Sequence, residues 1–370
     1  VYPVFGHWAW GGTFSGNPTW LANEGFVDFA GSTVVHGTGG WVALAAVIAV
    51  GPRIGRFDRE GPVPIPASDL PMAMLGLLLF FVGWVGFNGG STLGMDAAIP
   101  GIIANTLISG AVGLIVANLL QPFLAPALER AIAPVNGGLA GLVAVTAACH
   151  AVTALEAALI GGVGATVMLI ADRALIASRI DDAVGAIPVH LAAGIWGTMA
   201  VALFGDPALL GTGLTRGEQV VAQVKGIGVC ALWSFGIAYL LLGIVRLATP
   251  LRVSAAQEHI GLNVSEHGAR STLYELTEVM DRQTRTFDLS IRAPVEPFTE
   301  VGQIASSYNR VVGALEEATN RTRQIVRDIR DGILTFDAEG VLLSFNPGAE
   351  KLLEVEAGTV IGRPIDEVLG

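Results

Sequence analysis

Two stretches of the chain, Asp28-Phe-Ala-Gly-Ser-Thr-Val-Val-His36 and Asp182-Ala-Val-Gly-Ala-Ile-Pro-Val-His190, follow one pattern. Each begins with Asp and ends with Val-His, and each His is followed four residues later by Gly. Matching segments in two halves of a chain indicate an internal repeat with a shared site where the halves meet. The pattern therefore predicts that His36 and His190 belong to one site.

Both stretches lie among long runs that contain no Asp, Glu, Lys or Arg. Charged residues form 14% of the 370-residue chain, whereas about 25% is usual for a soluble protein. A membrane-spanning helix needs about 20 mostly apolar residues. A very hydrophobic soluble enzyme is the alternative, but a soluble fold does not need so many runs of this length. The sequence predicts seven spans, at roughly residues 29–51, 70–90, 100–122, 136–150, 154–174, 186–204 and 219–246.

The charges divide the chain into a membrane part and a soluble part. Residues 1–250 carry 22 charged side chains, and residues 251–370 carry 31. Arginines beside the predicted spans gather on one side, which predicts that this side and the C-terminal part are cytoplasmic. They are Arg53, Arg56, Arg59, Arg130, Arg173, Arg179, Arg246 and Arg252, against Arg216 on the other side. The net charge of −11 argues against a nucleic acid partner.

Histidine within a spanning helix is costly and is usually functional. Two neutral imidazoles can hydrogen-bond as donor and acceptor, and such a pair can exchange protons with a passing amine. The glycine four residues after each His lies on the same helix face and allows another helix to approach. The alternative is two unrelated buried histidines, each bonded to a backbone carbonyl. Asp28 and Asp182 are expected to cap helix starts, and Asp28 has the alternative role of orienting a cation site.

Further segments complete a family pattern. They are His7-Trp-Ala-Trp10-Gly-Gly, Gly83-Trp84-Val-Gly86-Phe87-Asn88-Gly-Gly-Ser91, Gly138-Leu-Ala-Gly-Leu-Val-Ala-Val-Thr146-Ala-Ala-Cys149, and Leu251-Arg-Val with Gly261-Leu-Asn-Val and His267-Gly268. Together with the two His stretches, they resemble in order the segments of the ammonium transporter/Rhesus family. In that family the first stretch reads Asp-Phe-Ala-Gly-Gly-x-Val-Val-His, so Ser32 departs from it. Six extra residues within residues 13–23 are a second departure.

The resemblance implies an all-α polytopic membrane protein. The family fold has eleven helices, arranged as two inverted five-helix repeats and a last long helix, and it forms homotrimers. The match begins just before the fifth helix, so helices five to eleven are expected here and the chain is interpreted as truncated at both ends. Because much of one repeat would then be absent, we expect that this fragment does not conduct alone.

By matching position, the resemblance implies roles for seven residues. These are Trp10 and Ser91 in an outer recruitment site, Phe87 in the aromatic gate, Trp84 in the pore wall, His36 and His190 as twin pore histidines, and Asp28 as a structural residue. Taken singly, the three aromatic residues would be assigned to core packing or to the membrane interface. An aromatic face attracts a small cation, and an apolar constriction imposes the full desolvation cost on K⁺ or Na⁺.

The soluble part is predicted to contain three segments after the membrane domain of residues 1–250. Residues 251–268 resemble the family's cytoplasmic tail. Residues 269–325 show apolar positions at helical spacing and resemble a HAMP linker, with a plain helical linker as the alternative. Residues 326–370 read as strand, turn, strand and helix, with the hairpin at Asp337-Ala-Glu-Gly340. They resemble the start of a PAS domain and would form a partial α+β domain.

The predicted function is passage of ammonium or ammonia, with methylammonium as an analogue, across a bacterial inner membrane. The alternative is an ammonium sensor that uses the channel fold without significant transport. A PII-type regulator or a downstream signalling domain is an expected partner, beside the lipid bilayer. No cofactor and no metal site are predicted, and no enzyme, because nucleophile, metal-ligand and phosphate-loop patterns are absent from the sequence. An output enzyme beyond residue 370 remains compatible with this interpretation.

Overall fold

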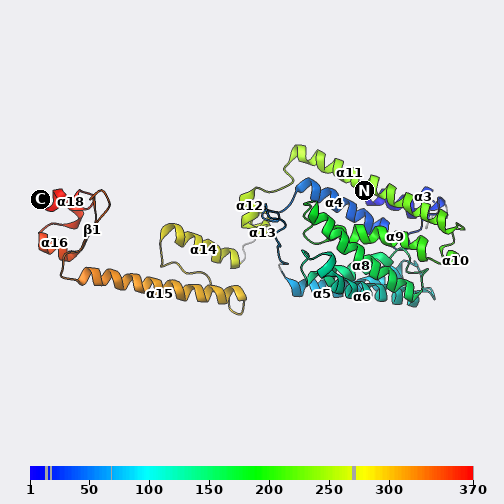
Figure 1. The fold of residues 1–370 in the computed structure, drawn as a ribbon, viewed down its shortest axis with the longest axis horizontal. Coiled ribbons are helices and arrows are strands. Elements are labelled where there is room, and N and C mark those ends of the chain that lie inside the picture. The colour runs from blue at the N-terminus through cyan, green and yellow to red at the C-terminus, as the bar shows by residue number, and fades with distance from the viewer. Residues whose placement is uncertain (13–15, 17–18, 68, 269–271, 370) are drawn as a thin grey trace. The chain divides into compact units, whose positions relative to one another are not determined.

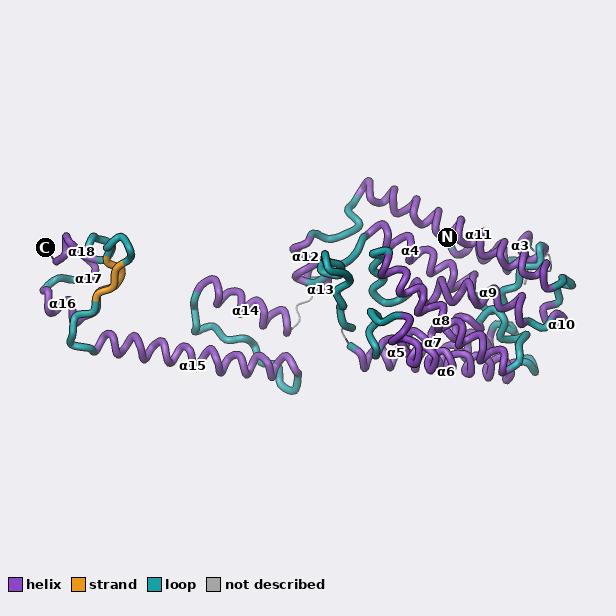
Figure 2. Tube along the Cα trace, in the orientation of Figure 1, coloured by secondary structure: helices purple, strands orange, loops and turns teal. Residues whose placement is uncertain are grey.

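The computed structural model describes the chain except for residues 13–15, 17–18, 68, 269–271 and 370. The described residues form two compact units, Val1–Val253 and Ser254–Gly370 (Figures 1 and 2). Much of the predicted insertion within residues 13–23 lies outside the described residues. Its last residues form the short helix α3 (Trp20–Asn23).

The first unit is an α-helical bundle. Short π-helical segments η1 (Ser32–Gly37) and η2 (Ile187–Ala192) lead directly into α4 and α9. The α-helices besides α3 are α1 (Tyr2–Trp10), α4 (Thr38–Val50), α5 (Leu70–Gly90), α6 (Ile99–Leu124), α7 (Ile132–Val145), α8 (Ala154–Ala177), α9 (Ala193–Phe204), α10 (Pro207–Leu210) and α11 (Arg216–Ala248).

Six helical segments of the described chain are long and apolar enough to cross a membrane, which confirms a helical polytopic membrane fold. They are Ser32–Val50, Leu70–Gly90, Ile99–Leu124, Ala154–Ala177, Ile187–Phe204 and Arg216–Ala248. Many of their large apolar side chains face outward, as lipid-facing surfaces require. Threonine capping boxes begin two of the long helices, with Thr153 before α8 and Thr215 before α11.

The predicted span at residues 136–150 ends early. Its helix, α7, has 14 residues and gives way to turns after Val145. The carbonyls of Thr146 and Ala147 there accept hydrogen bonds from the backbone N–H groups of Ala30 and Phe29. The carbonyls are thus used to hold the segment that precedes η1, a requirement that apolar composition does not reveal.

The second unit begins with α12 (Ala255–Ile260) and α13 (Leu262–His267). Two amphipathic helices follow, α14 (Thr272–Thr286) and α15 (Glu300–Asp328). The connector between them is held by Asn309, whose side chain donates to and accepts from the backbone of Ala293 at 2.8 and 2.9 Å. Leu276, Ala293 and Ala305 are buried together, so this part is a packed helix–connector–helix unit.

The predicted hairpin near the C-terminus is confirmed. Strand β1 (Leu334–Phe336) pairs antiparallel with β2 (Leu342–Phe345). The Asp337 carboxylate accepts the N–H groups of Glu339 and Val341 in the turn, and Gly340 takes a φ of +81°. Three short helices complete the unit: α16 (Pro347–Leu353), α17 (Ala357–Val360) and α18 (Ile365–Leu369).

Candidate functional site

Each of the two repeated stretches forms a capped π-helical segment. The carboxylate of Asp28 accepts hydrogen bonds of 2.8–2.9 Å from four backbone N–H groups at the start of η1, those of residues 31–34. The carboxylate of Asp182 accepts from Gly185 and Ile187 at the start of η2, at 3.1 and 2.6 Å. These contacts satisfy the N–H groups that a helix start leaves without partners.

The two repeated segments touch at Gly40 and Gly194, the glycines that lie four residues after each His. A Cβ atom on Gly40 would lie 2.6 Å from the Cβ of Leu191, beside His190. A Cβ atom on Gly194 would lie 2.5 Å from the carbonyl oxygen of Ser32. Any larger side chain at these two positions would therefore push the two segments apart.

The close approach brings the two histidines together. Nδ1 of His36 lies 3.2 Å from Nδ1 of His190, and the ring centroids are 5.2 Å apart. One Nδ1 must carry the hydrogen and the other must accept it. His36 is 9% exposed, and its Nε2 has no hydrogen-bond partner among the described residues. The pair therefore leaves a buried ring nitrogen available for another polar group.

Aromatic rings cover His36 from helix α5. The indole of Trp84 stacks on the imidazole with centroids 5.1 Å apart, and the ring of Phe87 lies 5.7 Å away. Trp84 Nε1 donates to Thr146 Oγ1 at 3.0 Å, and Thr146 Oγ1 donates to the carbonyl of Leu142. The structure thus brings His36, His190, Trp84 and Phe87 into one cluster.

The other predicted site residues lie around this cluster. Trp10 Nε1 donates to the carbonyl oxygen of Asp28 at 2.7 Å, so these two residues form a second group. Ser91 follows the last residue of α5, one helical turn beyond Phe87, and its hydroxyl donates to the Phe87 carbonyl at 2.8 Å.

The residues that sequence reasoning left without a role are Thr146 and Asn88. A polar side chain inside an otherwise apolar span was the available signal for both.

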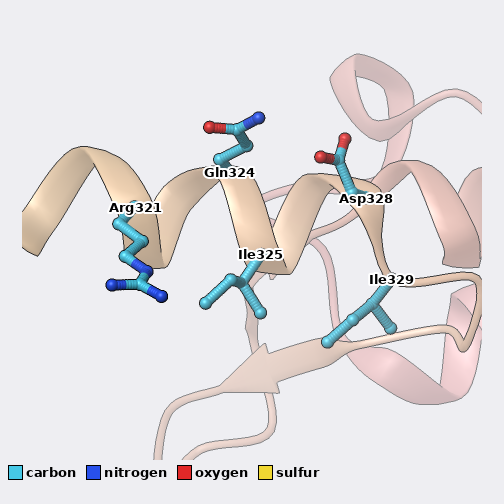
Figure 3. Close-up of a pocket in the computed structure, with 5 residues that line it drawn as sticks. All are labelled: Arg321, Gln324, Ile325, Asp328 and Ile329. Atoms are coloured by element: carbon cyan, nitrogen blue, oxygen red, sulfur yellow. The ribbon is translucent and has the colours of Figure 1, made fainter.

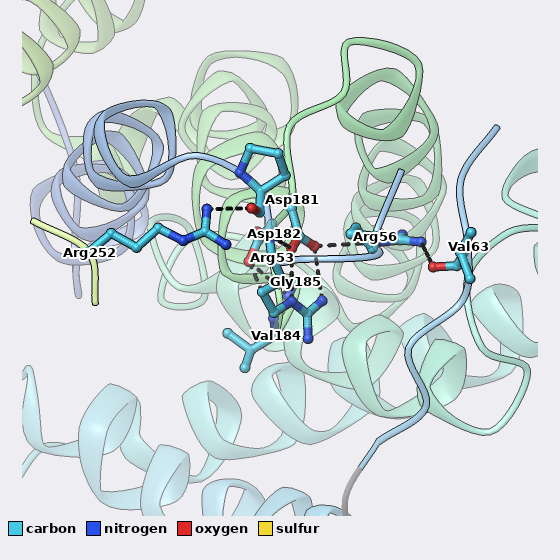
Figure 4. Close-up of polar contacts among 9 residues, drawn as sticks. Arg53, Arg56, Val63, Asp181, Asp182, Val184, Gly185 and Arg252 are labelled. Carbon is cyan, nitrogen blue, oxygen red and sulfur yellow. Dashed lines mark hydrogen bonds and ion pairs between the residues drawn. The ribbon is translucent and has the colours of Figure 1, made fainter. Parts of the chain in front are cut away.

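A second region lies where several arginines meet the ends of the spans (Figure 4). Arg53, in the loop after α4, donates from Nε and Nη2 to the two carboxylate oxygens of Asp181 at 2.8 and 2.9 Å, and Arg56 approaches the same carboxylate. Burial acts to raise the pKa of Asp181, but hydrogen bonds and charge from Arg53, with charge from Arg56, outweigh it and lower the pKa. Arg252 donates to the carbonyl of Pro52.

Each unit also contains a cavity. The larger, of about 1180 Å³, lies at the arginine-rich end of the bundle, and its lining includes Arg53, Asp172, Asp182 and Gly185. It therefore reaches the cap of the segment that carries His190. The smaller, of about 430 Å³, is an open groove along the end of α15, lined by Arg321, Gln324, Ile325, Asp328 and Ile329 (Figure 3). Among the described residues, no group of three or more His, Cys, Asp and Glu side chains is placed to hold a metal ion.

Residues 1–272 match the family described as the Ammonium Transporter Family. The chain belongs to the ammonium transporter family. A Synechocystis sp. protein provisionally named an ammonium transporter is 47% identical over 87% of this chain and 60% of its own length. Ammonium transporter Amt2 of Archaeoglobus fulgidus is 36% identical over 73% of this chain and 61% of its own length. The chain thus spans about three fifths of these two relatives.

Two solved structures have a fold similar to that of this chain. One described as a sensor Amt protein superposes with a TM-score of 0.69 at 40% identity, and it covers 72% of this chain and 66% of that chain. Saccharomyces cerevisiae Mep2 superposes with a TM-score of 0.62 at 25% identity over 70% of this chain and 58% of that chain. Membership of a transporter family agrees with the prediction that this is not an enzyme.

Proposed function

We propose that the protein passes ammonium or ammonia across a membrane through a pathway lined by His36, His190, Trp84 and Phe87. The 3.2 Å contact between the two Nδ1 atoms carries the proposal, because it sets a polar pair inside an otherwise apolar wall. The names of the relatives, several of them ammonium transporters, support the same substrate.

The chemistry of the pair favours a species that can give up a proton. K⁺ and Na⁺ would lose their hydration shell beside the rings of Trp84 and Phe87, and nothing there replaces it in full. Ammonium can deprotonate and cross as ammonia, which costs far less to dehydrate. The paired imidazoles donate and accept hydrogen bonds with the neutral molecule, and they can relay a proton.

The remaining predicted residues complete the proposed pathway. Trp10 and Ser91 would recruit the cation at the outer end, because an indole face and a hydroxyl oxygen both attract an ammonium ion. Asp28 would hold the start of η1 in place through its four backbone hydrogen bonds. The large cavity at the arginine-rich end would be the cytoplasmic exit, in agreement with the rule that arginines gather on the cytoplasmic side.

The test uses the full-length protein in liposomes, because this chain spans part of its relatives. Ammonium-dependent current and methylammonium uptake are measured for the wild type and for His36→Ala. Selective flux in the wild type that falls, or that admits K⁺, in the variant supports the pathway. A wild type that carries no flux although it binds ammonium rejects transport and leaves a receptor.

The second candidate function is ammonium sensing, and the attached second unit favours it. The solved sensor Amt protein is 40% identical to this chain. We assign the unit of α14, the connector and α15 to a HAMP-like linker within residues 269–325, and residues 326–370 to the start of a PAS domain. The packed connector at Asn309 and the hairpin at Asp337 support these assignments. Residues 251–268 would be the family-type tail.

The proposed setting is a bacterial inner membrane with residues 251–370 in the cytoplasm. A homotrimer, and contact with a PII-type regulator or a downstream signalling domain, complete the proposal. Sensing predicts that ammonium changes the output of the full-length protein even in a variant with blocked flux. An output that follows flux alone, and disappears with it, would leave transport as the function of the membrane unit.

A further inference from the structure

Ser32 is the residue at which the first Asp–His stretch departs from the family pattern, where glycine stands instead. We propose that the Ser32 hydroxyl is a positioning group of the pathway, which opens the end of α7 and thereby fixes the Trp84 indole on His36. The inference rests on the proposed pathway, in which these two rings line the route. It gives a role to a side chain that the family pattern lacks.

The Ser32 hydroxyl lies between two backbone groups at the end of α7. Its Oγ donates to the carbonyl oxygen of Val143 at 2.7 Å and accepts from the backbone N–H of Ala147 at 2.8 Å. In a continuing α-helix this N–H would donate directly to that carbonyl, because the two residues are four positions apart. A side chain that inserts between such groups interrupts the helix. The insertion therefore explains why α7 gives way to turns after Val145.

The inserted hydroxyl lies in the interior of the bundle. Ser32, Val143 and Ala147 are each 0% exposed. A buried backbone N–H or carbonyl group destabilises the fold when it has no partner. The hydroxyl satisfies both groups at once, because it donates one hydrogen bond and accepts another. The open turn is therefore stable while this hydroxyl, or a water molecule in its place, is present.

The opened turn contains Thr146, which holds a ring of the pathway. Thr146 Oγ1 accepts a hydrogen bond from Trp84 Nε1 at 3.0 Å, and the indole stacks on His36 with centroids 5.1 Å apart. His36 and Ser32 belong to the same segment, η1. One segment therefore carries the histidine and also holds the turn that places its aromatic partner. Without the Ser32 hydroxyl, η1 and the end of α7 can shift independently, and the indole moves relative to the imidazole.

The test compares Ser32→Ala and Ser32→Gly in the full-length protein. Alanine keeps the Cβ and removes the hydroxyl, which leaves too little space for a water molecule. Glycine removes the Cβ as well, so one water molecule can enter and take over both hydrogen bonds. Ser32→Ala should lower methylammonium flux about fivefold, the factor that one net hydrogen bond represents, and it should lower the selectivity for ammonium over K⁺. Ser32→Gly should recover most of the flux and the selectivity.

Hydrogen exchange of the Ala147 amide measures the insertion directly. Exchange should be faster in Ser32→Ala, because the amide loses its acceptor, and it should return toward the wild-type rate in Ser32→Gly. Ser109→Ala is the matched control. Ser109 is also 0% exposed, and its hydroxyl donates to the carbonyl of Gly141 on α7 at 2.7 Å, away from the open turn. The control should keep the wild-type selectivity and the wild-type exchange rate at Ala147.

Several results would overturn the inference. Wild-type flux and selectivity in Ser32→Ala would show that the hydroxyl positions nothing in the pathway. Equal losses of flux in the alanine and glycine variants, with selectivity unchanged, would show a role in stability alone, because selectivity does not depend on the amount of folded protein. A wild type without flux rejects the transport proposal. The exchange rate at Ala147 still tests the insertion in that case, and an unchanged rate in Ser32→Ala would reject it.

Discussion

Nδ1 of His36 and Nδ1 of His190 share one hydrogen across 3.2 Å, although the two residues are 154 positions apart in the chain. The contact uses the same ring atom of each residue, as two related repeats that face each other would produce. Because both Nδ1 atoms are occupied, each imidazole can meet a third molecule only through Nε2. The pair therefore offers two polar atoms to other molecules, Nε2 of His36 and Nε2 of His190.

The bond from Thr146 to Trp84 should be needed for the position of the indole on His36. Thr146→Val leaves the indole N–H without its acceptor, which should cost about 1–3 kcal/mol of stability and lower methylammonium flux. Thermal unfolding and liposome uptake of the full-length protein measure the two effects. Thr166→Val is the matched control, because the Thr166 hydroxyl bonds only to Gly162 of its own helix in the described contacts. Equal effects of the two variants would contradict the prediction.

The glycine contact between the repeats should tolerate no side chain. In Gly194→Ala the new Cβ would meet the Ser32 carbonyl at 2.5 Å, so the segments must separate. Such overpacking typically costs about 1–3 kcal/mol, and flux should fall because the histidines move apart. In Gly236→Ala on α11, the new Cβ meets no described atom within 4 Å, and stability should be kept or improved. Melting temperatures that match in both variants would argue against a tight contact.

The carboxylate of Asp28 should be more important for stability than that of Asp206. The Asp28 carboxylate accepts hydrogen bonds from four backbone N–H groups and the residue is 5% exposed, whereas the Asp206 carboxylate accepts one, from the backbone N–H of Ala208 at the start of the short helix α10. Asp28→Asn removes at least one charged acceptor and should cost about 2 kcal/mol or more. Asp206→Asn should change the free energy of unfolding by less than about 1 kcal/mol. Calorimetry of both proteins checks the order, and the reverse order would refute the capping role.

The ion pair of Asp181 with Arg53 should make the free energy of unfolding depend on pH at the acid end. Arg53 and Arg56 hold the folded-state pKa of Asp181 below its ordinary value of 3.8. A lowered pKa in the folded state stabilises the protein above the unfolded-state value, so the contribution is complete at neutral pH. It is lost as the pH falls below about 3.8 and through the folded-state pKa.

Unfolding of the wild type and of Asp181→Asn, followed between pH 7 and pH 3, measures this contribution. The variant should be less stable at pH 7, and the difference between the two proteins should shrink at the acid end. Asp58→Asn is the control, because the Asp58 carboxylate bonds to backbone N–H groups in an exposed turn. If the difference in unfolding free energy between wild type and Asp181→Asn grows as the pH falls, the predicted direction of the Asp181 pKa shift is wrong.

The helices and the hairpin were predictable from local pattern. Uncharged runs such as residues 70–90 and 154–174 have spanning length, and α5 and α8 occupy them. The hairpin follows from Asp337 and Gly340, because a turn needs a local side-chain acceptor and a residue that tolerates positive φ. These signals lie within a few residues of the structure that they specify.

Other features were not predictable from local pattern. The π-helical turns at His36 and His190 have no signal in the local pattern. The early end of α7 depends on backbone partners that are distant in the sequence. Thr146 illustrates this, because its carbonyl bonds to Ala30 and its hydroxyl accepts from Trp84. The amino-acid composition of residues 136–150 reveals neither contact, so it favoured a continuous helix.

The sequence by itself determined six of the seven predicted membrane spans, the paired Asp and His stretches and the family, since hydrophobicity and spacing are properties of the chain. The tertiary structure decided that His36 and His190 bond through Nδ1, and that Asn88 is left with a free acceptor. Both results follow from close packing of helices, between residues 154 positions apart for the two histidines and 18 positions apart for Asn88 and Thr106, whose side chains hydrogen-bond to each other. The direction of a hydrogen bond depends on which neighbour has already used its single hydrogen, and only the folded arrangement shows this.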